Sequence, residues 1–320
     1  MNIKVTVRSS SFKEILDGRL GAHGFSSHLI DMDQPLAPQI SDAEVIVNGN
    51  SKIDKSVIDS CPNLKFVHQA GIGYDNIDVQ YCTSKSIFVA NVPLANSISV
   101  AEHTLSLMIL LAKNMQSTGA RVMRRNPGTL GIELYGKTLL IVGLGASGIE
   151  VAKRAKAFGM TVIAVTKDPV EAGREKSFFA DEVSEPEALS EFIPRADFIS
   201  LHAPLTDETR GMISKEQFGS MKGTAFLVNV ARAPIVDREA LFDALKNKTI
   251  AGAAFDVFWE EPAAPDDKLL QLDNFILTPH IAGWTKESVE AMAGVIASNI
   301  LRVSDGKSPL TLVNSELLRQ

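Results

Sequence analysis

Gly143-Leu144-Gly145-Ala146-Ser147-Gly148 follows the apolar run Leu139 to Val142 and precedes the segment Ile149 to Phe158. A strand, a glycine turn and a helix in this order predict a dinucleotide-binding unit. The first glycine permits the tight turn, the second lets the backbone approach a pyrophosphate, and the third lets helix and strand pack closely. The phosphates would meet the free N–H groups of the helix. The alternating segment Thr161 to Val165 supports this interpretation, although many glycine turns bind nothing.

The chain has 320 residues, of which 45% are hydrophobic, and this length and composition predict about two domains with large cores. A formal net charge of -6 argues against a nucleic-acid-binding surface. The basic cluster Arg121, Arg124 and Arg125 is too small to reverse that balance, and a solvated helix end explains it more simply.

The two cysteines, Cys61 and Cys82, lack the spacing of a metal site or redox motif. We expect half-buried packing residues in a reducing compartment, with neither a disulfide nor a metal site. The chain begins with the alternating segment Ile3 to Val7, without the apolar region of a signal peptide. The longest apolar stretch, Leu107 to Ala112, is too short to span a bilayer. We therefore expect a cytoplasmic protein with no membrane partner.

The first part of the chain alternates between short apolar strands and polar or helical segments, which predicts a parallel sheet. The expected strands are Ile3 to Val7, Val45 to Asn48 and Leu64 to His68. Gly71-Ile72-Gly73 comes just after the third strand, at the carboxyl end where open α/β sheets bind ligands. An ordinary turn is an equally good interpretation of these glycines.

A long apolar helix is predicted from Ser99 to Met115, with Ser97 or Ser99 as its cap and an end near Gly119. We expect it to begin the second domain and to contribute to an interdomain or subunit contact. Its polar residues Glu102 and His103 could belong to a site, but polar pairs on packed helices are more often structural.

The alternation of strands and helices restarts at Thr138, which predicts a second parallel sheet. Ser214 and Gln217 form a capping box for one helix, and the final helix runs from Lys286 to Val303. We expect this helix to return to the first domain. The expected strands are Thr138 to Val142, Thr161 to Val165, Phe198 to Leu201, Ala225 to Asn229, Ile250 to Asp256 and Phe275 to Leu277.

Three polar residues that follow late strands, Arg232, Glu261 and His280, could together reduce a 2-oxo acid. The planar guanidinium of Arg232 can bind a substrate carboxylate through two hydrogen bonds. His280 would donate a proton, held in place by Glu261, and would act as the base in the oxidative direction. Taken one at a time, Arg232 could be a surface ion-pair partner, Glu261 a solvated loop acid and His280 a buried structural histidine. The remaining histidines lack such partners and are expected to be structural: His23, His28, His68, His103 and His202.

Nearly the whole chain resembles the D-isomer-specific 2-hydroxyacid dehydrogenase family. Besides the glycine turn, the matching segments are Gly71 to Asp78, Ser200 to Thr206, Val228 to Arg232, Asp256 to Pro262 and Thr278 to Gly283. The resemblance implies an α/β fold of two doubly wound parallel sheets, with a Rossmann domain inserted into a flavodoxin-like substrate-binding domain. The implied boundaries are 1–96, 97–284 and 285–320. It also implies a homodimer with a cleft between the domains.

The resemblance gives Arg232, Glu261 and His280 the roles argued above. It implies that the N–H groups of Ile72 and Gly73, after Gly71, hold the substrate carboxylate, and that Asp256 contacts the nicotinamide carboxamide. The other positions at which the family touches the cofactor are Gly143, Gly145, Ala146, Ser147, Gly148, Pro204, Thr209, Val230, His280 and Gly283.

The sequence departs from the family pattern at three places. Ala233 stands where a glycine usually follows the arginine, with Pro234 next, which is expected to stiffen that loop. Trp284 could reach the substrate pocket or anchor a subunit contact.

The third departure concerns the choice of cofactor. Counting residues from the glycine turn predicts Asp168 as the acid that binds the adenosine ribose. That acid must stand at the end of the strand Thr161 to Val165, however, and Thr166-Lys167 stands there instead. A hydroxyl and a cation suit a 2′-phosphate, so we expect NADP to be preferred over NAD, with Asp168 a turn residue.

The sequence thus predicts an oxidoreductase that uses NAD(P)H to reduce a small 2-oxo acid, such as glyoxylate or hydroxypyruvate, to the D-2-hydroxy acid. Oxidation of another small anion such as phosphite is an alternative. Formate fits less well, because formate dehydrogenases of this superfamily carry glutamine where Glu261 stands. A nucleotide-sensing binding protein of the same fold is the alternative outside enzymes.

Overall fold

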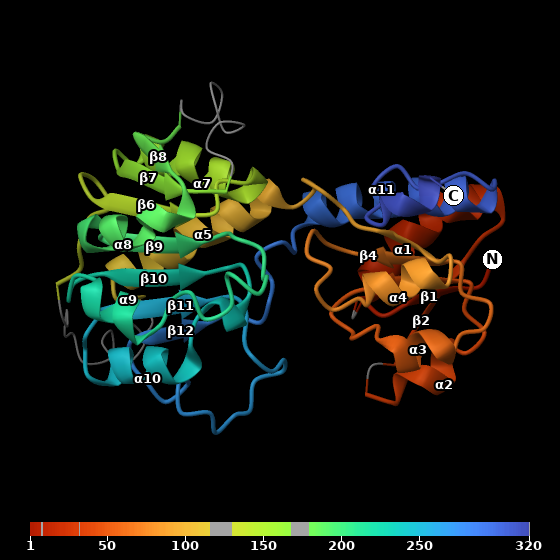
Figure 1. Ribbon diagram of the computed structural model, residues 1–320, viewed down its shortest axis with the longest axis horizontal. Helices are drawn as coiled ribbons and strands as arrows, with labels where there is room; N and C mark the ends of the chain where they lie inside the picture. The colour runs from red at the N-terminus through yellow and green to blue at the C-terminus, as the bar shows by residue number, and fades with distance from the viewer. Residues whose placement is uncertain (8, 32, 116–129, 168–178, 320) are drawn as a thin grey trace. The chain divides into compact units, whose positions relative to one another are not determined.

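The computed structural model describes the chain except for residues 8, 32, 116–129, 168–178 and 320. It divides into two compact units (Figure 1). Unit 1 comprises Met1–Asn96 and Trp284–Gln320, and unit 2 comprises Ser97–Gly283. The cluster of Arg121, Arg124 and Arg125 lies outside the described residues, as does the predicted helix end near Gly119.

Unit 1 is built on a five-stranded parallel sheet in the order β2-β1-β3-β4-β5, the order of a flavodoxin-like fold. Its central strands are apolar on both faces because helices cover both of them. In β3, Val45 and Val47 face one core while Ile46 faces the other. The strands are β1 (Ile3–Val5), β2 (Ser27–Leu29), β3 (Val45–Asn48), β4 (Phe66–Gln69) and β5 (Phe88–Ala90).

The helices of unit 1 form two layers. On one face, Phe12 and Leu16 of α1 (Ser10–Leu20) pack with Met292 and Ile296 of α11 (Lys286–Ser304). Figure 1 shows these two helices beside each other, although most of the chain separates them in sequence. The other face is covered by α2 (Leu36–Ile40), α3 (Lys55–Asp59) and α4 (Val79–Ser84).

Unit 2 contains a seven-stranded parallel sheet in the order β12-β11-β10-β9-β6-β7-β8. The order reverses between β9 and β6, and such a reversal marks the ligand-binding crevice of a Rossmann fold. The strands are β6 (Thr138–Val142), β7 (Thr161–Val165), β8 (Glu182–Ser184), β9 (Phe198–Leu201), β10 (Phe226–Asn229), β11 (Gly252–Phe255) and β12 (Phe275–Leu277).

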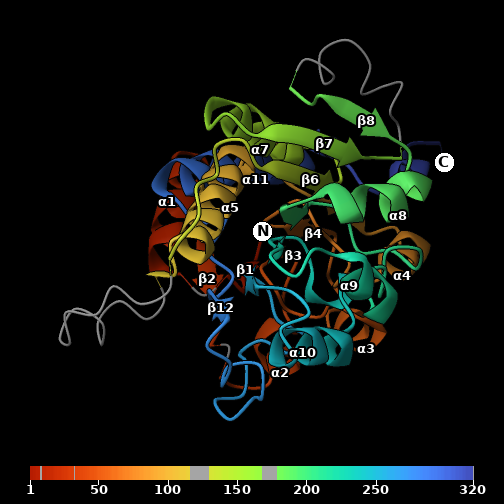
Figure 2. The same ribbon diagram turned by 90° about the vertical axis from the view of Figure 1, so that its left-hand side faces the viewer.

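Helices cover both faces of this sheet as well (Figure 2). Leu139 and Ile141 of β6 face the core of α5 (Ser97–Ala112) and α7 (Ala146–Ala157), while Leu140 and Val142 face the opposite core. That second core is formed with α8 (Leu189–Phe192), α9 (Lys215–Ser220) and α10 (Arg238–Lys246). The molecule is therefore an α/β protein with two doubly wound parallel sheets.

Several boundaries differ from those expected from the sequence. The helix predicted from Ser99 to Met115 begins at Ser97 and ends at Ala112, and the one predicted from Ile149 begins at Ala146. The short strands β2, β5 and β8 were not predicted; β2 and β8 lie at sheet edges and contain mostly polar residues. Cys61 and Cys82 are buried free thiols rather than half-buried ones. The capping box is present, with the Ser214 amide donating to Gln217 Oε1 at 3.1 Å.

Candidate active site

The glycine turn between β6 and α7 shows why each glycine is needed. Gly143 has φ +99°, and a Cβ there would lie 2.6 Å from the backbone nitrogen of Ala203. At Gly148 a Cβ would lie 2.3 Å from the Gly143 carbonyl oxygen. Gly145 differs, because a Cβ there would meet no heavy atom within 4 Å among the described residues. The first and third glycines are thus required by packing, and the second faces open space.

This arrangement fits a dinucleotide pyrophosphate. Helix α7 begins at Ala146, directly after Gly145, and no side chain caps its first turn in the part of the chain described. The first N–H groups of an α-helix have no partner within the helix, and the helix dipole favours an anion at that end. Gly145, Ala146 and Ser147 therefore present backbone donors to the open space that the missing Cβ leaves.

The end of β7 holds the two residues expected to decide the choice of cofactor. The amide of Thr166 donates to the carbonyl of Ser184 at 2.9 Å. The exposed Lys167 ammonium lies 3.7 Å from Glu208 Oε2, and the two side chains are 65% and 70% exposed. Glu208 thus pairs with the lysine that the sequence predicts to bind a 2′-phosphate. Asp168 lies outside the described residues.

The loop after β9 is fixed by the Thr209 hydroxyl, which donates to the Pro204 carbonyl at 2.7 Å and accepts from the Thr206 amide at 2.8 Å. His202 lies just before it, with Nε2 2.8 Å from Ser200 Oγ. Burial lowers the pKa of His202 to about 4, so its ring is neutral at physiological pH. Pro204 and Thr209 thus belong to a rigid turn at the carboxyl end of a strand adjoining the glycine turn.

Arg232 lies on the loop after β10, which Asn229 holds in place. The buried Asn229 side chain donates from Nδ2 to the Arg232 carbonyl at 3.0 Å and accepts from the Ala231 amide at 3.0 Å. Ala233 and Pro234 begin a short 3₁₀ turn directly after the arginine. Asn229 was not singled out in the sequence, although a polar residue ending a buried strand was a signal for it.

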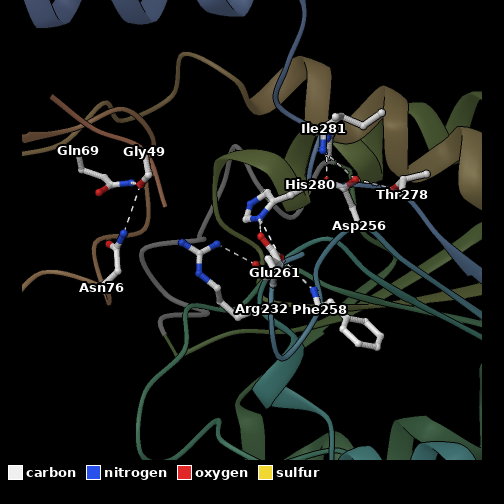
Figure 3. A network of polar contacts seen from close by, with 12 residues as sticks. Gly49, Gln69, Asn76, Arg232, Asp256, Phe258, Glu261, Thr278, His280 and Ile281 are labelled. Atoms are coloured by element: carbon white, nitrogen blue, oxygen red, sulfur yellow. Dashed lines mark hydrogen bonds and ion pairs between the residues drawn. The ribbon is translucent and has the colours of Figure 1, made fainter. Parts of the chain in front are cut away.

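Glu261 and His280 form an ion pair. His280 Nδ1 lies 2.8 Å from Glu261 Oε2 and 3.1 Å from Oε1, and each side chain is 31% exposed. The Phe258 amide also donates to Glu261 Oε1 at 3.0 Å. Figure 3 shows the guanidinium of Arg232 on the same side as this pair. The structure thus brings together the three residues that the sequence places on separate strand ends.

The pKa of Glu261 reflects these neighbours. Burial raises it, but the hydrogen bond and charge of His280, the Phe258 amide and the charge of Arg232 outweigh burial. The net result is a pKa below the ordinary value of 4.5, so Glu261 is a carboxylate at neutral pH. A carboxylate at this position favours the protonated form of the imidazole beside it.

A buried carboxylate, Asp256, anchors the loop that carries His280. Asp256 is 1% exposed and accepts hydrogen bonds from the Thr278 hydroxyl at 2.5 Å and from the amides of Ile281 and Ala282 at 3.0 and 2.7 Å. Burial raises its pKa, but these donors and His103 together lower it below the ordinary value of 3.8. Both carboxylate oxygens are thus used to hold the chain on either side of His280.

Asp256→Asn is expected to destabilise unit 2 by about 3 kcal/mol near neutral pH, because an amide group would face the donors that the carboxylate now accepts. A lowered folded-state pKa means that this contribution is full above the unfolded value and is lost as pH falls through the folded value. The difference between the two proteins should therefore shrink below about pH 3.8. Urea unfolding in a Trp284→Phe background, where Trp259 is the sole tryptophan, measures it. A difference that stays constant into acid would contradict this role.

In unit 1, a partly buried polar network fixes the loops after β3 and β4 (Figure 3). Gln69 Nε2 and Asn76 Nδ2 both donate to the Gly49 carbonyl, at 2.7 and 3.2 Å. The carbonyls of Gly71 and Ile72 accept bonds from the Val92 amide and the Asn91 side chain. Within the described residues, the N–H groups of Ile72 and Gly73 make no hydrogen bond. Successive unused amides of this kind can bind an anion.

His68 and Trp284, two residues discussed in the sequence analysis, lie in unit 1. Burial lowers the pKa of His68 to about 4, and its Nε2 lies 3.0 Å from Asn299 Nδ2, so it is a neutral core residue. Trp284 is 41% exposed, and its ring centroid lies 6.2 Å from that of Phe12. The structure therefore gives Trp284 a packing contact with α1.

The glycine turn, the order of the second sheet and the polar groups at its strand ends are typical of a dinucleotide-binding Rossmann domain. Residues 105–282 match the family model described as D-isomer specific 2-hydroxyacid dehydrogenase, NAD binding domain. The chain belongs to the D-isomer specific 2-hydroxyacid dehydrogenase family.

Known members of this family differ in substrate. The chain is 43% identical, over 88% of its length, to a D-3-phosphoglycerate dehydrogenase of Methanocaldococcus jannaschii, of which the match spans 53%. It is 38% identical over 88% of its length to a glyoxylate reductase of Korarchaeum cryptofilum, with 86% of that protein covered. A D-lactate dehydrogenase from Aquifex aeolicus, solved with NAD and lactic acid, has a TM-score of 0.83 and 30% identity, with 95% and 96% of the two chains covered.

The chain thus spans about half the length of the phosphoglycerate dehydrogenase. In the parts of the chain that the structure describes, no helix is long and apolar enough to cross a bilayer.

Proposed function

We propose that this protein reduces a small 2-oxo acid to the D-2-hydroxy acid with a nicotinamide cofactor. The observation that carries the proposal is the ion pair between Glu261 and His280, with Arg232 on the same side. An imidazole paired with a carboxylate can donate the proton, and a guanidinium can bind the carboxylate of a 2-oxo acid. A glyoxylate- or hydroxypyruvate-like substrate is favoured because 2-oxo acids carry the carboxylate that Arg232 would bind.

Each residue has a distinct role in the proposed reaction. Arg232 binds the substrate carboxylate and polarises the neighbouring carbonyl. The cofactor, when bound, supplies the hydride. With Nδ1 of His280 directed at Glu261, Nε2 is the nitrogen that gives its proton to the carbonyl oxygen. Glu261 orients the ring and favours its protonated form. In the oxidative direction, the neutral ring accepts the hydroxyl proton.

The amides of Ile72 and Gly73, which make no hydrogen bond among the described residues, are proposed to bind the substrate carboxylate. For the cofactor, we propose that Gly145, Ala146 and Ser147 bind the pyrophosphate, and that Pro204, Thr209, Val230, Asp256 and Gly283 line the rest of its site. The domain roles follow, with unit 2 binding the cofactor and unit 1 the substrate.

A panel of 2-oxo acids tests this function directly. Oxidation of NADPH and NADH is followed by absorbance with glyoxylate, hydroxypyruvate, pyruvate and 3-phosphohydroxypyruvate. Turnover of at least one acid, with the D-hydroxy acid as product, is expected. Tight binding of either nucleotide without turnover of any acid would overturn the proposal in favour of a binding protein. Reduction of NADP by phosphite alone would identify the other dehydrogenase activity.

We further propose that NADPH is preferred over NADH, because Thr166 and Lys167 directly follow β7, where a Rossmann fold would bind the adenosine ribose. Lys167→Ala is expected to lower kcat/KM for NADPH about tenfold while leaving that for NADH within about twofold, because only NADPH carries the charged 2′-phosphate. Steady-state kinetics with both cofactors measure the change. Lys215→Ala, which removes an exposed lysine on α9, is the control.

Glu208→Gln provides the opposite variant. Removing the carboxylate that now pairs with Lys167 should raise kcat/KM for NADPH and leave that for NADH unchanged. Equal efficiency of NADH and NADPH in the wild type, or an equal loss with both cofactors in Lys167→Ala, would contradict the NADPH preference.

We also propose a cytoplasmic homodimer. Large apolar side chains of unit 2 lie open to solvent after α5, with Met115, Leu130 and Tyr135 exposed by 44%, 93% and 74%. A contact between subunits would remove such apolar side chains from water. Sedimentation analysis tests the stoichiometry, and Leu130→Asp should shift the protein toward the monomer.

A further inference from the structure

His103 on α5 contacts the anchor of the His280 loop. Its Nε2 lies 3.0 Å from Thr278 Oγ1 and 3.4 Å from Asp256 Oδ1. His103 is separated from both by more than 150 residues of sequence, and its side chain is 18% exposed. The sequence favoured a structural role for His103, and no assigned role in substrate or cofactor binding involves it.

The hydrogen bonds define which nitrogen of His103 carries a proton. The Thr278 hydroxyl has one hydrogen, and its 2.5 Å contact with Asp256 Oδ1 is the short distance of a bond to a carboxylate. Thr278 Oγ1 must then accept from His103, so Nε2 of His103 carries a hydrogen. The same N–H points toward Asp256 Oδ1, and it therefore helps to hold the buried carboxylate in one orientation.

Asp256 in turn determines the backbone on both sides of His280. Its two oxygens accept the amides of Ile281 and Ala282 and the hydroxyl of Thr278. Between these anchors, His280 has φ +56°, a left-handed conformation that a residue with a side chain keeps only when its surroundings fix it. The His280 amide closes a tight turn to the Thr278 carbonyl at 3.0 Å.

We propose that His103 is a positioning residue for His280, acting through Thr278 and Asp256. Its N–H keeps the Asp256 carboxylate oriented toward the two amides that follow His280, and so keeps the imidazole directed at Glu261. The inference rests on the proposed function for its catalytic consequence, but the anchoring of the loop is independent of any substrate.

Hydrogen exchange tests the anchoring without substrate. In His103→Leu, the amides of Ile281 and Ala282 are expected to exchange about tenfold faster than in the wild type, because the carboxylate loses one donor. His103→Gln, whose Nε2 can replace the imidazole N–H, should keep exchange within about threefold of the wild type. The β10 amides report global opening and should not change. Glu102→Gln is the matched control, because Glu102 lies next to His103 on α5 and the change removes only its exposed ion pair with Arg154 of α7.

Kinetics with NADPH and an acid from the panel test the catalytic consequence. His103→Leu should lower kcat about tenfold while KM for NADPH stays within about twofold, and His103→Gln should restore most of kcat. Unchanged exchange at Ile281 and Ala282 in a folded His103→Leu protein would overturn the proposal, as would faster exchange with normal kcat. If His103→Leu does not fold, the His103→Gln variant tests the proposal alone. Faster exchange at Ile281 and Ala282 together with a lower kcat in that variant would contradict the proposal, because its amide N–H should replace the N–H of the imidazole.

The two proposals fail in different ways. A wild-type protein that reduces no 2-oxo acid would refute the proposed function, while exchange in the variants would still show whether His103 anchors the loop. A wild type that turns over normally, with exchange insensitive to His103, would refute the positioning role alone.

Discussion

His280→Ala is expected to lower kcat for 2-oxo acid reduction by about a thousandfold, the range in which positioned general acids contribute. The loss follows from removing the proton donor that pairs with Glu261. Binding of NADPH, measured by fluorescence titration, should stay within about threefold of the wild type, because the glycine turn is untouched. Arg232→Ala should give a similar loss of turnover through the substrate carboxylate.

The control for this prediction is His28→Ala, which removes an exposed histidine from β2 in unit 1 and should leave kcat unchanged. Glu261→Gln separates orientation from charge, because the amide can still accept from the ring but no longer favours its protonated form. Wild-type turnover by His280→Ala would refute the assignment of the acid. A protein that no longer binds NADPH would show instead that the residue is needed for the fold of the loop.

Gly148→Ala is expected to have the largest effect on stability, destabilising unit 2 by about 3 kcal/mol. Its new methyl group would lie 2.3 Å from the Gly143 carbonyl oxygen and 3.3 Å from Ile141 Cγ2, so the backbone of the turn itself would have to shift. The higher helix propensity of alanine recovers only about 1 kcal/mol, so the steric clash dominates. Urea unfolding of the variant, with Trp259 as the reporter in a Trp284→Phe background, measures the change.

Gly145→Ala is the matched control within the same turn. Gly145 has φ -80°, and a Cβ there meets no heavy atom within 4 Å among the described residues, so stability should change by less than about 1 kcal/mol. The methyl group would occupy the space proposed for the pyrophosphate, and NADPH affinity should fall about tenfold or more. Equal stability of Gly148→Ala and the wild type would contradict the packing argument, and unchanged affinity in Gly145→Ala would contradict the location of the phosphates.

The fold could be predicted where the local pattern is strong. The strands β6, β7, β9 and β12 were predicted with their observed ends, because buried parallel strands are apolar on both faces and end at polar residues. The short strands β2 and β8 were missed. Both lie at sheet edges, and β2 is mostly polar, so neither shows the apolar pattern of a buried strand. The start of α7 was predicted three residues late, because the helix begins inside the glycine motif itself.

The site was predictable where sheet topology brings residues together. Arg232, Glu261 and His280 each follow a strand of one parallel sheet, and the carboxyl ends of such strands lie at one edge. Their roles remain predictions until variants are measured. The contact of His103 with Asp256 and Thr278 could not be predicted, because it depends on where the face of α5 packs against the sheet. No spacing in the sequence encodes that contact.

The hydrogen bonds among His103, Thr278 and Asp256 also connect the two ends of unit 2. His103 lies in the second turn of the first helix of unit 2, and Ala282 is one residue from the end of that unit. The entry and the exit of this segment are thus held together by its own side chains. A segment whose termini are already neighbours can be grafted into a surface loop of another protein, or circularly permuted, without strain on the recipient.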